Sequence, residues 1–226
     1  MSYNTFTPIV TDGLVLCLDA ANTKSYPGTG TSWLDLSKNG NNGTLINVPV
    51  YNSSNGGVLV FDGVDDYGRI PYNSNFNLSN TNYTLEGWFN SNSFSNGQIL
   101  ISKDTNGSNF DWCLYIPNSM SLAIYSNGTS TNVTAIVPTM STGQWYHFVV
   151  TSISGVIRIY LNSVLYQTQS MSTSNSSQVY VTLGCSSWNA PNTFTNGKIS
   201  ILRTYRKGLS DSEVLQNYNA TKFRFQ

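Results

Sequence analysis

The sequence predicts an all-β protein, a sandwich or barrel built from short strands. Hydrophobic residues recur with a period of two rather than the 3.6-residue period of a helix. Clusters of Gly, Asn, Ser and Pro separate the apolar runs, as in residues 39–43 (NGNNG). Asn and Gly tolerate positive φ and therefore favour tight turns. Many short strands at roughly even spacing, with turn signals between them, are typical of sandwiches and barrels.

The predicted strands share runs of β-branched, aromatic and aliphatic side chains. They cover residues 14–19, 58–61, 83–89, 98–102, 112–116, 121–125, 133–137, 145–151, 156–161, 179–183 and 198–205. The strand at 145–151 is apolar on both faces, which predicts a central position in a sheet. Arg158 interrupts one face of the strand at 156–161, so that face should meet solvent or a groove.

One helix is predicted, near the end of the chain. Ser210 and Glu213 have the spacing of a capping box, and Val214, Leu215 and Tyr218 would form its apolar face. We expect this helix to pack on a sheet edge or against the mouth of the sandwich. No shift in composition divides residues 12–226, which predicts one domain there. Residues 1–11 are predicted to form an N-terminal arm.

The composition excludes several classes of protein. Charged residues make up 10% of the chain, against about 25% in an ordinary soluble domain. Eleven basic and eleven acidic residues balance, so nucleic acid is not an expected partner. Apolar runs are too short for membrane insertion or for a signal peptide. The three cysteines, Cys17, Cys113 and Cys185, are predicted to be buried thiols rather than a disulfide framework.

The sequence does not favour an enzyme. Glu86 is the only Glu on a predicted strand, and no carboxylate lies two residues away to form a glycosidase pair. A Ser–His–Asp triad would have to use His147, the single histidine, whose aromatic neighbours predict a packed position.

The densest acidic cluster is Asp62, Asp65 and Asp66. Carboxylates on a turn could hold Ca²⁺, a hard cation that prefers oxygen ligands. The alternative is that Asp62 caps the amides after Gly63 while Asp65 and Asp66 are solvated. No other cofactor is expected.

A carbohydrate ligand would require aromatic faces and amide groups. Trp188 and Asn189 lie in a polar loop, and Trp33 and Trp112 are not obvious core positions. These four residues are the predicted ligand-binding residues. Trp88 and Trp145 lie on predicted strands and are expected in the core.

Several segments resemble, in order, the laminin-G-like, concanavalin A-like modules. They are residues 13–20 (GLVLCLDA), 33–45 (WLDLSKNGNNGTL), 61–67 (FDGVDDY), 83–89 (YTLEGWF), 145–151 (WYHFVVT), 159–162 (IYLN), 197–205 (GKISILRTY) and 209–214 (LSDSEV). The resemblance implies a jelly roll of two curved antiparallel sheets with a short C-terminal helix. It implies no particular activity, because the fold carries lectins, adhesion modules, hydrolases and structural parts. Ser163 departs from the family's usual Gly after Asn162, so a longer or differently shaped turn is expected there.

The missing secretion signal and the surface rich in Asn, Ser and Thr also resemble modules of tailed-bacteriophage virion proteins. We therefore predict a non-enzymatic module made in the host cytoplasm and placed on the virion surface, as a capsid decoration, head fibre or tail fibre. Its expected partners are virion proteins and host-surface glycans, and a homo-oligomer would suit this role. The arm residues Met1, Tyr3, Phe6 and Pro8 would attach it to the particle. The alternatives are an extracellular lectin or adhesion module not on a virion and, least favoured, a glycoside hydrolase.

Overall fold

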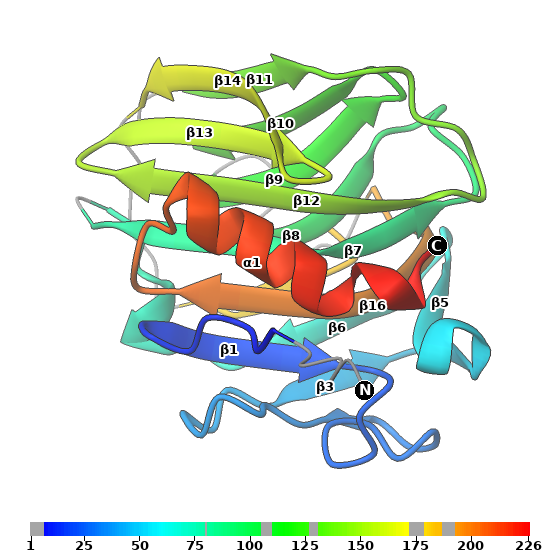
Figure 1. The fold of residues 1–226 in the computed structure, drawn as a ribbon. Coiled ribbons are helices and arrows are strands. Elements are labelled where there is room, and N and C mark those ends of the chain that lie inside the picture. The colour runs from blue at the N-terminus through cyan, green and yellow to red at the C-terminus, as the bar shows by residue number, and fades with distance from the viewer. Residues whose placement is uncertain (1–6, 80, 105–109, 127–130, 172–178, 187–192) are drawn as a thin grey trace, which may run out of the picture.

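The computed structural model describes residues 7–79, 81–104, 110–126, 131–171, 179–186 and 193–226. Two sheets pack face to face, and every strand pairing is antiparallel (Figure 1). The predicted all-β jelly-roll sandwich with a short C-terminal helix is therefore confirmed.

The first sheet carries the helix on its outer face. Its strands, in spatial order, are β14 (Val164–Ser170), β13 (Val156–Leu161), β12 (Trp145–Ile153), β7 (Tyr83–Ser91), β16 (Asn196–Tyr205), β5 (Val58–Asp62) and β4 (Val50–Asn52), and β1 (Leu14–Asp19) also pairs with β16.

The second sheet forms the other layer. Its strands, in spatial order, are β11 (Thr131–Ile136), β10 (Ser121–Ser126), β9 (Phe110–Asn118), β8 (Gln98–Asp104), β15 (Val181–Leu183), β6 (Tyr67–Ile70), β3 (Gly43–Ile46) and β2 (Ser32–Trp33). The 3₁₀ helices among the described residues are η1 (Ser54–Gly56), η2 (Ser74–Phe76) and η4 (Lys222–Arg224).

Every predicted strand overlaps an observed one, and the strands missed by sequence are short or polar. β14 is an edge strand of mainly exposed or half-buried residues, so it lacks a continuous apolar face. β12 occupies the predicted interior position of its sheet. The hairpin from β13 to β14 is a tight two-residue turn, with Asn162 and Ser163 both at positive φ. The expectation of a longer turn at Ser163 is wrong, because Ser163 adopts the left-handed conformation there.

The central strands are buried on both faces because the helix covers one side and the second sheet the other. On β7, Leu85 and Phe89 belong to the core between the sheets, whereas Glu86 and Trp88 face the helix. Gly87 lies on the core side, where a Cβ would overlap the Ile201 carbonyl and the Phe148 ring. A glycine is therefore required by close packing.

The helix α1 (Asp211–Thr221) begins with the predicted capping box of Ser210 and Glu213. It lies across the outer face of the first sheet, not at an edge or at the mouth as predicted (Figure 1). Its buried residues are Val214, Asn217 and Thr221. Leu215, predicted to lie on the apolar face, is 47% exposed. The buried stripe is thus partly polar, which the sequence pattern did not indicate.

The three cysteines form no disulfide and are buried, as predicted. Among the described residues, no helix is long and apolar enough to cross a membrane.

Candidate functional site

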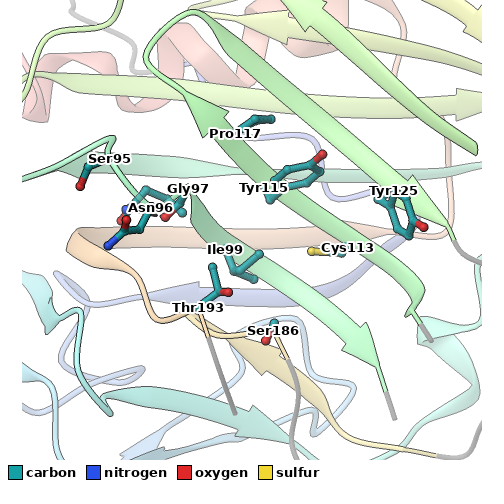
Figure 2. Close-up of a pocket in the computed structure, with 11 residues that line it drawn as sticks. Ser95, Asn96, Gly97, Ile99, Cys113, Tyr115, Pro117, Tyr125, Ser186 and Thr193 are labelled. Atoms are coloured by element: carbon teal, nitrogen blue, oxygen red, sulfur yellow. Dashed lines mark hydrogen bonds between the residues drawn. The ribbon is translucent and has the colours of Figure 1, made fainter. Parts of the chain in front are cut away.

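A pocket opens on the outer face of the second sheet, the face that points away from the first sheet. On β9, Trp112 and Leu114 point into the core, so the alternating Cys113, Tyr115 and Pro117 point outward and line the pocket (Figure 2). The register sets the neighbouring positions. Ile99 on β8 pairs with Tyr115, and Tyr125 on β10 pairs with Cys113.

Polar residues form the rim of this pocket, which has a volume of about 480 Å³. Ser95 and Asn96 come from the loop before β8, and both are exposed. Ser186 and Thr193 contribute to the lining from either side of residues 187–192 in the sequence. The volume falls in the range of roughly 300–1,000 Å³ that is typical of sites for small ligands.

The pocket combines aromatic rings with neutral hydrogen-bonding groups. Tyr115 and Tyr125 are half-buried, so each ring keeps an accessible part while its position is fixed by the sheet. Burial raises the pKa of Tyr115 and raises that of Cys113 well above its ordinary value, so both groups stay protonated at neutral pH. None of the described lining residues carries a formal charge.

The predicted role in ligand binding is wrong for two of the tryptophans. Trp33 and Trp112 are both 0% exposed. Trp112 donates from Nε1 to the Phe76 carbonyl at 3.0 Å, so even its polar end is used inside the protein. A ring in the core cannot stack on a ligand. Trp188 and Asn189 lie outside the described residues.

Sequence reasoning missed the two pocket tyrosines. A signal for Tyr115 was present, because Trp112, Leu114 and Ile116 alternate with Cys113, Tyr115 and Pro117. Only the packing shows which of these two sets points into the core.

Asp62, Asp65 and Asp66 do come together, on the turn that joins β5 to β6. One carboxylate oxygen of each lies within 4.8 Å of the others, a spacing that suits shared coordination of a hard cation. Asp62 Oδ1 also accepts from the amides of Val64 at 2.8 Å and Asp65 at 3.3 Å, as in the predicted cap. These hydrogen bonds lower the pKa of Asp62, whereas burial raises that of Asp66. Asp66 is buried, contrary to the alternative in which it is solvated.

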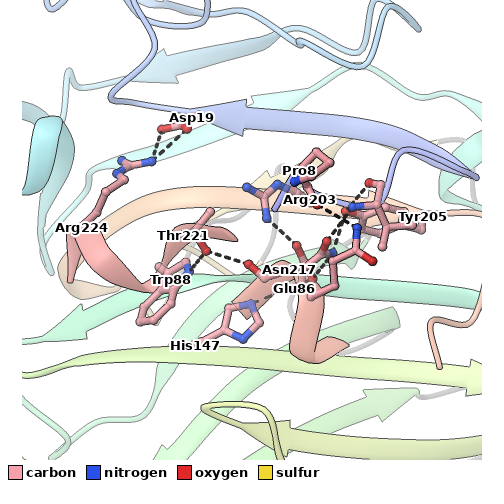
Figure 3. A network of polar contacts seen from close by, with 12 residues as sticks. Pro8, Asp19, Glu86, Trp88, His147, Arg203, Tyr205, Asn217, Thr221 and Arg224 are labelled. Carbon is pink, nitrogen blue, oxygen red and sulfur yellow. Dashed lines mark hydrogen bonds and ion pairs between the residues drawn. The ribbon is translucent and has the colours of Figure 1, made fainter. Parts of the chain in front are cut away.

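The second polar cluster lies beneath α1 and is isolated from the pocket. Glu86 accepts from Arg203 at 2.6 Å and from Asn217 at 2.9 Å, and Asn217 also donates to the Tyr205 hydroxyl (Figure 3). His147 is fully buried in the same region, 4.0 Å from Glu86. The helix covers this cluster, so a substrate has no access to its carboxylate or imidazole.

The described part of the predicted arm contacts the domain. The amide of Val10 donates to Asn217 Oδ1 at 2.8 Å, and its carbonyl accepts from the Tyr205 hydroxyl. Pro8 is exposed, and its carbonyl accepts from Gln216. Val10 is thus packed as part of the domain, although the sequence places it in the arm. Met1, Tyr3 and Phe6 lie outside the described residues.

A family model places the chain among known proteins. The model of the Concanavalin A-like lectin/glucanases superfamily matches residues 61–215, about two thirds of the sequence. No curated protein matches the chain.

Solved structures share the fold. Domain 4 of AbnA, a GH43 extracellular arabinanase from Geobacillus stearothermophilus in complex with arabinotriose, aligns with a TM-score of 0.67 and 20% identity, over 91% of this chain and 98% of that one. A structure of botulinum neurotoxin type C, described by its interaction with two ganglioside molecules, aligns with a TM-score of 0.71 and 18% identity, over 94% and 52%. Trypanosoma rangeli sialidase in complex with sialic acid aligns with a TM-score of 0.70 and 14% identity, over 98% and 36%. This chain therefore spans nearly all of the arabinanase domain but only about half and a third of the other two.

Proposed function

Because the chain belongs to the concanavalin A-like lectin/glucanase superfamily, we propose that it is a non-catalytic carbohydrate-binding module whose site is the pocket on the outer face of the second sheet. The observation that carries the proposal is the pairing of two half-buried tyrosines with a rim of hydroxyl and amide groups. The apolar face of a pyranose packs on an aromatic ring, and its hydroxyls exchange hydrogen bonds with neutral polar groups.

Three structural neighbours support a carbohydrate ligand. The arabinanase domain is in complex with arabinotriose, the sialidase is in complex with sialic acid, and the neurotoxin interacts with gangliosides. Sequence identities this low show only that the fold is shared, so the proposal depends on the pocket of this chain.

The non-catalytic part of the proposal depends on the positions of the acid–base residues. Glu86 and His147 lie beneath α1 on the first sheet, and Glu86 is paired with Arg203. None of the described lining residues has a carboxylate, whereas most glycoside hydrolases use a pair of them.

A glycan array followed by calorimetry on the best ligand tests the site. We expect Tyr115→Ala and Tyr125→Ala each to weaken binding by about 10-fold or more, since loss of one stacking ring costs about 1.4 kcal/mol. Phe223→Ala is the matched control, because Phe223 is an aromatic residue that is 56% exposed on η4, away from the pocket. Unchanged binding by both tyrosine variants would contradict the pocket as the site.

We also propose that the module acts on a virion surface, which rests on the composition rich in Asn, Ser and Thr and low in charge. Mass spectrometry of purified particles tests this placement. A deletion of residues 1–6 then tests attachment through the arm while sparing the contacts of Pro8 and Val10 with α1. Particle association that survives this deletion would contradict a role for Met1, Tyr3 and Phe6.

A further inference from the structure

Few charged residues occur in the part of the sequence that forms the pocket. Between residues 87 and 197 the ionisable acidic, basic and histidine side chains are Lys103, Asp104, Asp111, His147 and Arg158. This long segment contains every residue that lines the pocket.

The three charges on β8 and β9 are inaccessible to a ligand. Lys103, Asp104 and Asp111 are 0–1% exposed. The Lys103 ammonium lies 2.9 Å from the Asp111 carboxylate and also donates to Asn77 Oδ1 at 2.9 Å. This ion pair is buried, so neither charge is available to a ligand, and separating the two charges inside the protein would be strongly unfavourable.

The other two groups lie on the opposite sheet. His147 is on β12 beneath α1, and Arg158 on β13 pairs with Asp211 of the helix at 3.1 Å. Neither side chain is on the face that carries the pocket.

Among the described strands of the second sheet, Arg69 of β6 is the basic residue that is not buried. It pairs with Thr182, which pairs with Ser102, which pairs with Cys113 of the pocket. Three strand spacings of about 4.8 Å separate the backbone of Arg69 from that of Cys113 by roughly 14 Å. Its guanidinium also lies over the Tyr180 ring, 5.2 Å from the centroid.

Residues 105–109, 127–130, 172–178 and 187–192, which lie outside the described part of this region, contain no Asp, Glu, Lys, Arg or His. Wherever these segments lie, they cannot bring a formal charge to the pocket. Residues 87–197 therefore bring no ionisable acidic, basic or histidine side chain to the pocket beyond the five named above.

We propose that the pocket selects neutral saccharides and discriminates against sialylated and other anionic sugars. The inference rests on the proposed carbohydrate-binding function and adds the class of sugar. A carboxylate taken from water into this pocket would lose its hydration without gaining a cation, and such a transfer is unfavourable. A neutral sugar loses only hydroxyl hydration, which Ser, Thr, Asn and Tyr groups can replace.

The test is binding to matched glycan pairs that differ only in a terminal sialic acid. We expect each sialylated member to bind at least about 10-fold more weakly than its neutral partner, and the Kd for the neutral member to change less than about two-fold between 50 and 500 mM NaCl. Tighter or equal binding of the sialylated members, or affinity that falls steeply with salt, would overturn the inference while leaving carbohydrate binding intact. Absence of binding to both members of every pair would instead overturn the proposed function and this inference with it.

A gain-of-function variant provides a second readout. Asn96 is exposed on the pocket rim, so Asn96→Lys places an ammonium at the site with little effect on the core. We expect this variant to reduce the discrimination between the paired glycans by about three-fold or more. Asn96→Gln is the matched control and should retain the preference for the neutral member. Equal discrimination by the Lys and Gln variants would contradict a charge-based mechanism at this pocket.

Discussion

His147 illustrates how burial can dominate the properties of a residue. Its ring lies 5.1 Å from Trp88 and 5.6 Å from Tyr218 between ring centroids, so it packs as an aromatic side chain. Neither ring nitrogen has a hydrogen-bond partner among the described residues. Burial lowers the pKa of His147 to about 4, the neighbouring Glu86 opposes this shift, and Arg203 reinforces it. The imidazole is therefore neutral in the folded protein at physiological pH.

This burial predicts a pH-dependent loss of stability. The unfolded chain binds a proton at His147 below about pH 6.5, whereas the folded chain binds it only near pH 4. The contribution to stability is thus complete above pH 6.5 and is lost as the pH falls from 6.5 to 4, by on the order of 3 kcal/mol. Urea unfolding of the wild type and of His147→Phe across this range measures it.

The Phe variant removes the titrating group and keeps an aromatic ring against Trp88 and Tyr218. Its free energy of unfolding should fall less steeply between pH 6.5 and 4 than that of the wild type. His147→Gln, which also cannot titrate, should behave in the same way if Phe packs poorly. Equal pH dependence in all three proteins would show that His147 is not the responsible group.

The helix α1 is attached to the first sheet by polar as well as apolar contacts. Val214 packs among Val149, Tyr205 and Leu209, and Tyr218 stacks on Trp88 at 5.6 Å between centroids. Asn217 joins three parts of the molecule, because its side chain bonds to Val10, Glu86 and Tyr205. The helix therefore covers the buried Glu86–Arg203 ion pair as well as apolar surface.

We expect Asn217→Ala to destabilise the protein by about 2–4 kcal/mol. The change leaves the Val10 amide and one Glu86 oxygen without a buried partner, and such groups cost more than the hydrogen bonds themselves contribute. Thermal or urea unfolding measures the loss.

Gln216→Ala is the matched control on the neighbouring residue of the same helix. It removes a single exposed hydrogen bond to the Pro8 carbonyl and should cost less than about 0.5 kcal/mol. Similar losses in the two variants would contradict the special position of Asn217.

At the scale of the whole molecule, the turn with Asp62, Asp65 and Asp66 connects the two layers. It follows β5 in the first sheet and precedes β6 in the second. Three carboxylates held this close repel one another, and a bound cation would remove that repulsion and link the two sheets.

Calcium binding at this turn predicts a rise in melting temperature. With a Kd of about 0.1–1 mM, 5 mM CaCl₂ would stabilise the folded state by about 1–2 kcal/mol relative to EDTA, equivalent to roughly 2–8 °C in Tm. Scanning calorimetry in EDTA and then in CaCl₂ measures the shift, and Asp65→Asn should reduce it. No shift in either direction would contradict calcium binding.

Local sequence patterns and long-range packing determine different parts of the fold. The strands at 83–89 and 145–151 and the capping box at Ser210 follow from short segments, because alternation and capping are local properties. The placement of α1 on the sheet face could not be predicted, since it depends on Asn217 reaching residues far away in the sequence.

At the candidate site, too, the local sequence pattern predicts some features and tertiary packing determines others. Composition shows that residues 87–197 are almost uncharged, and the hydrophobic pattern shows that residues 112–117 alternate between two faces. The packing of the two sheets is what buries Trp112 and leaves Tyr115 accessible. Alternation defines two faces without saying which meets the opposite sheet, and that choice is made by packing against strands distant in the sequence.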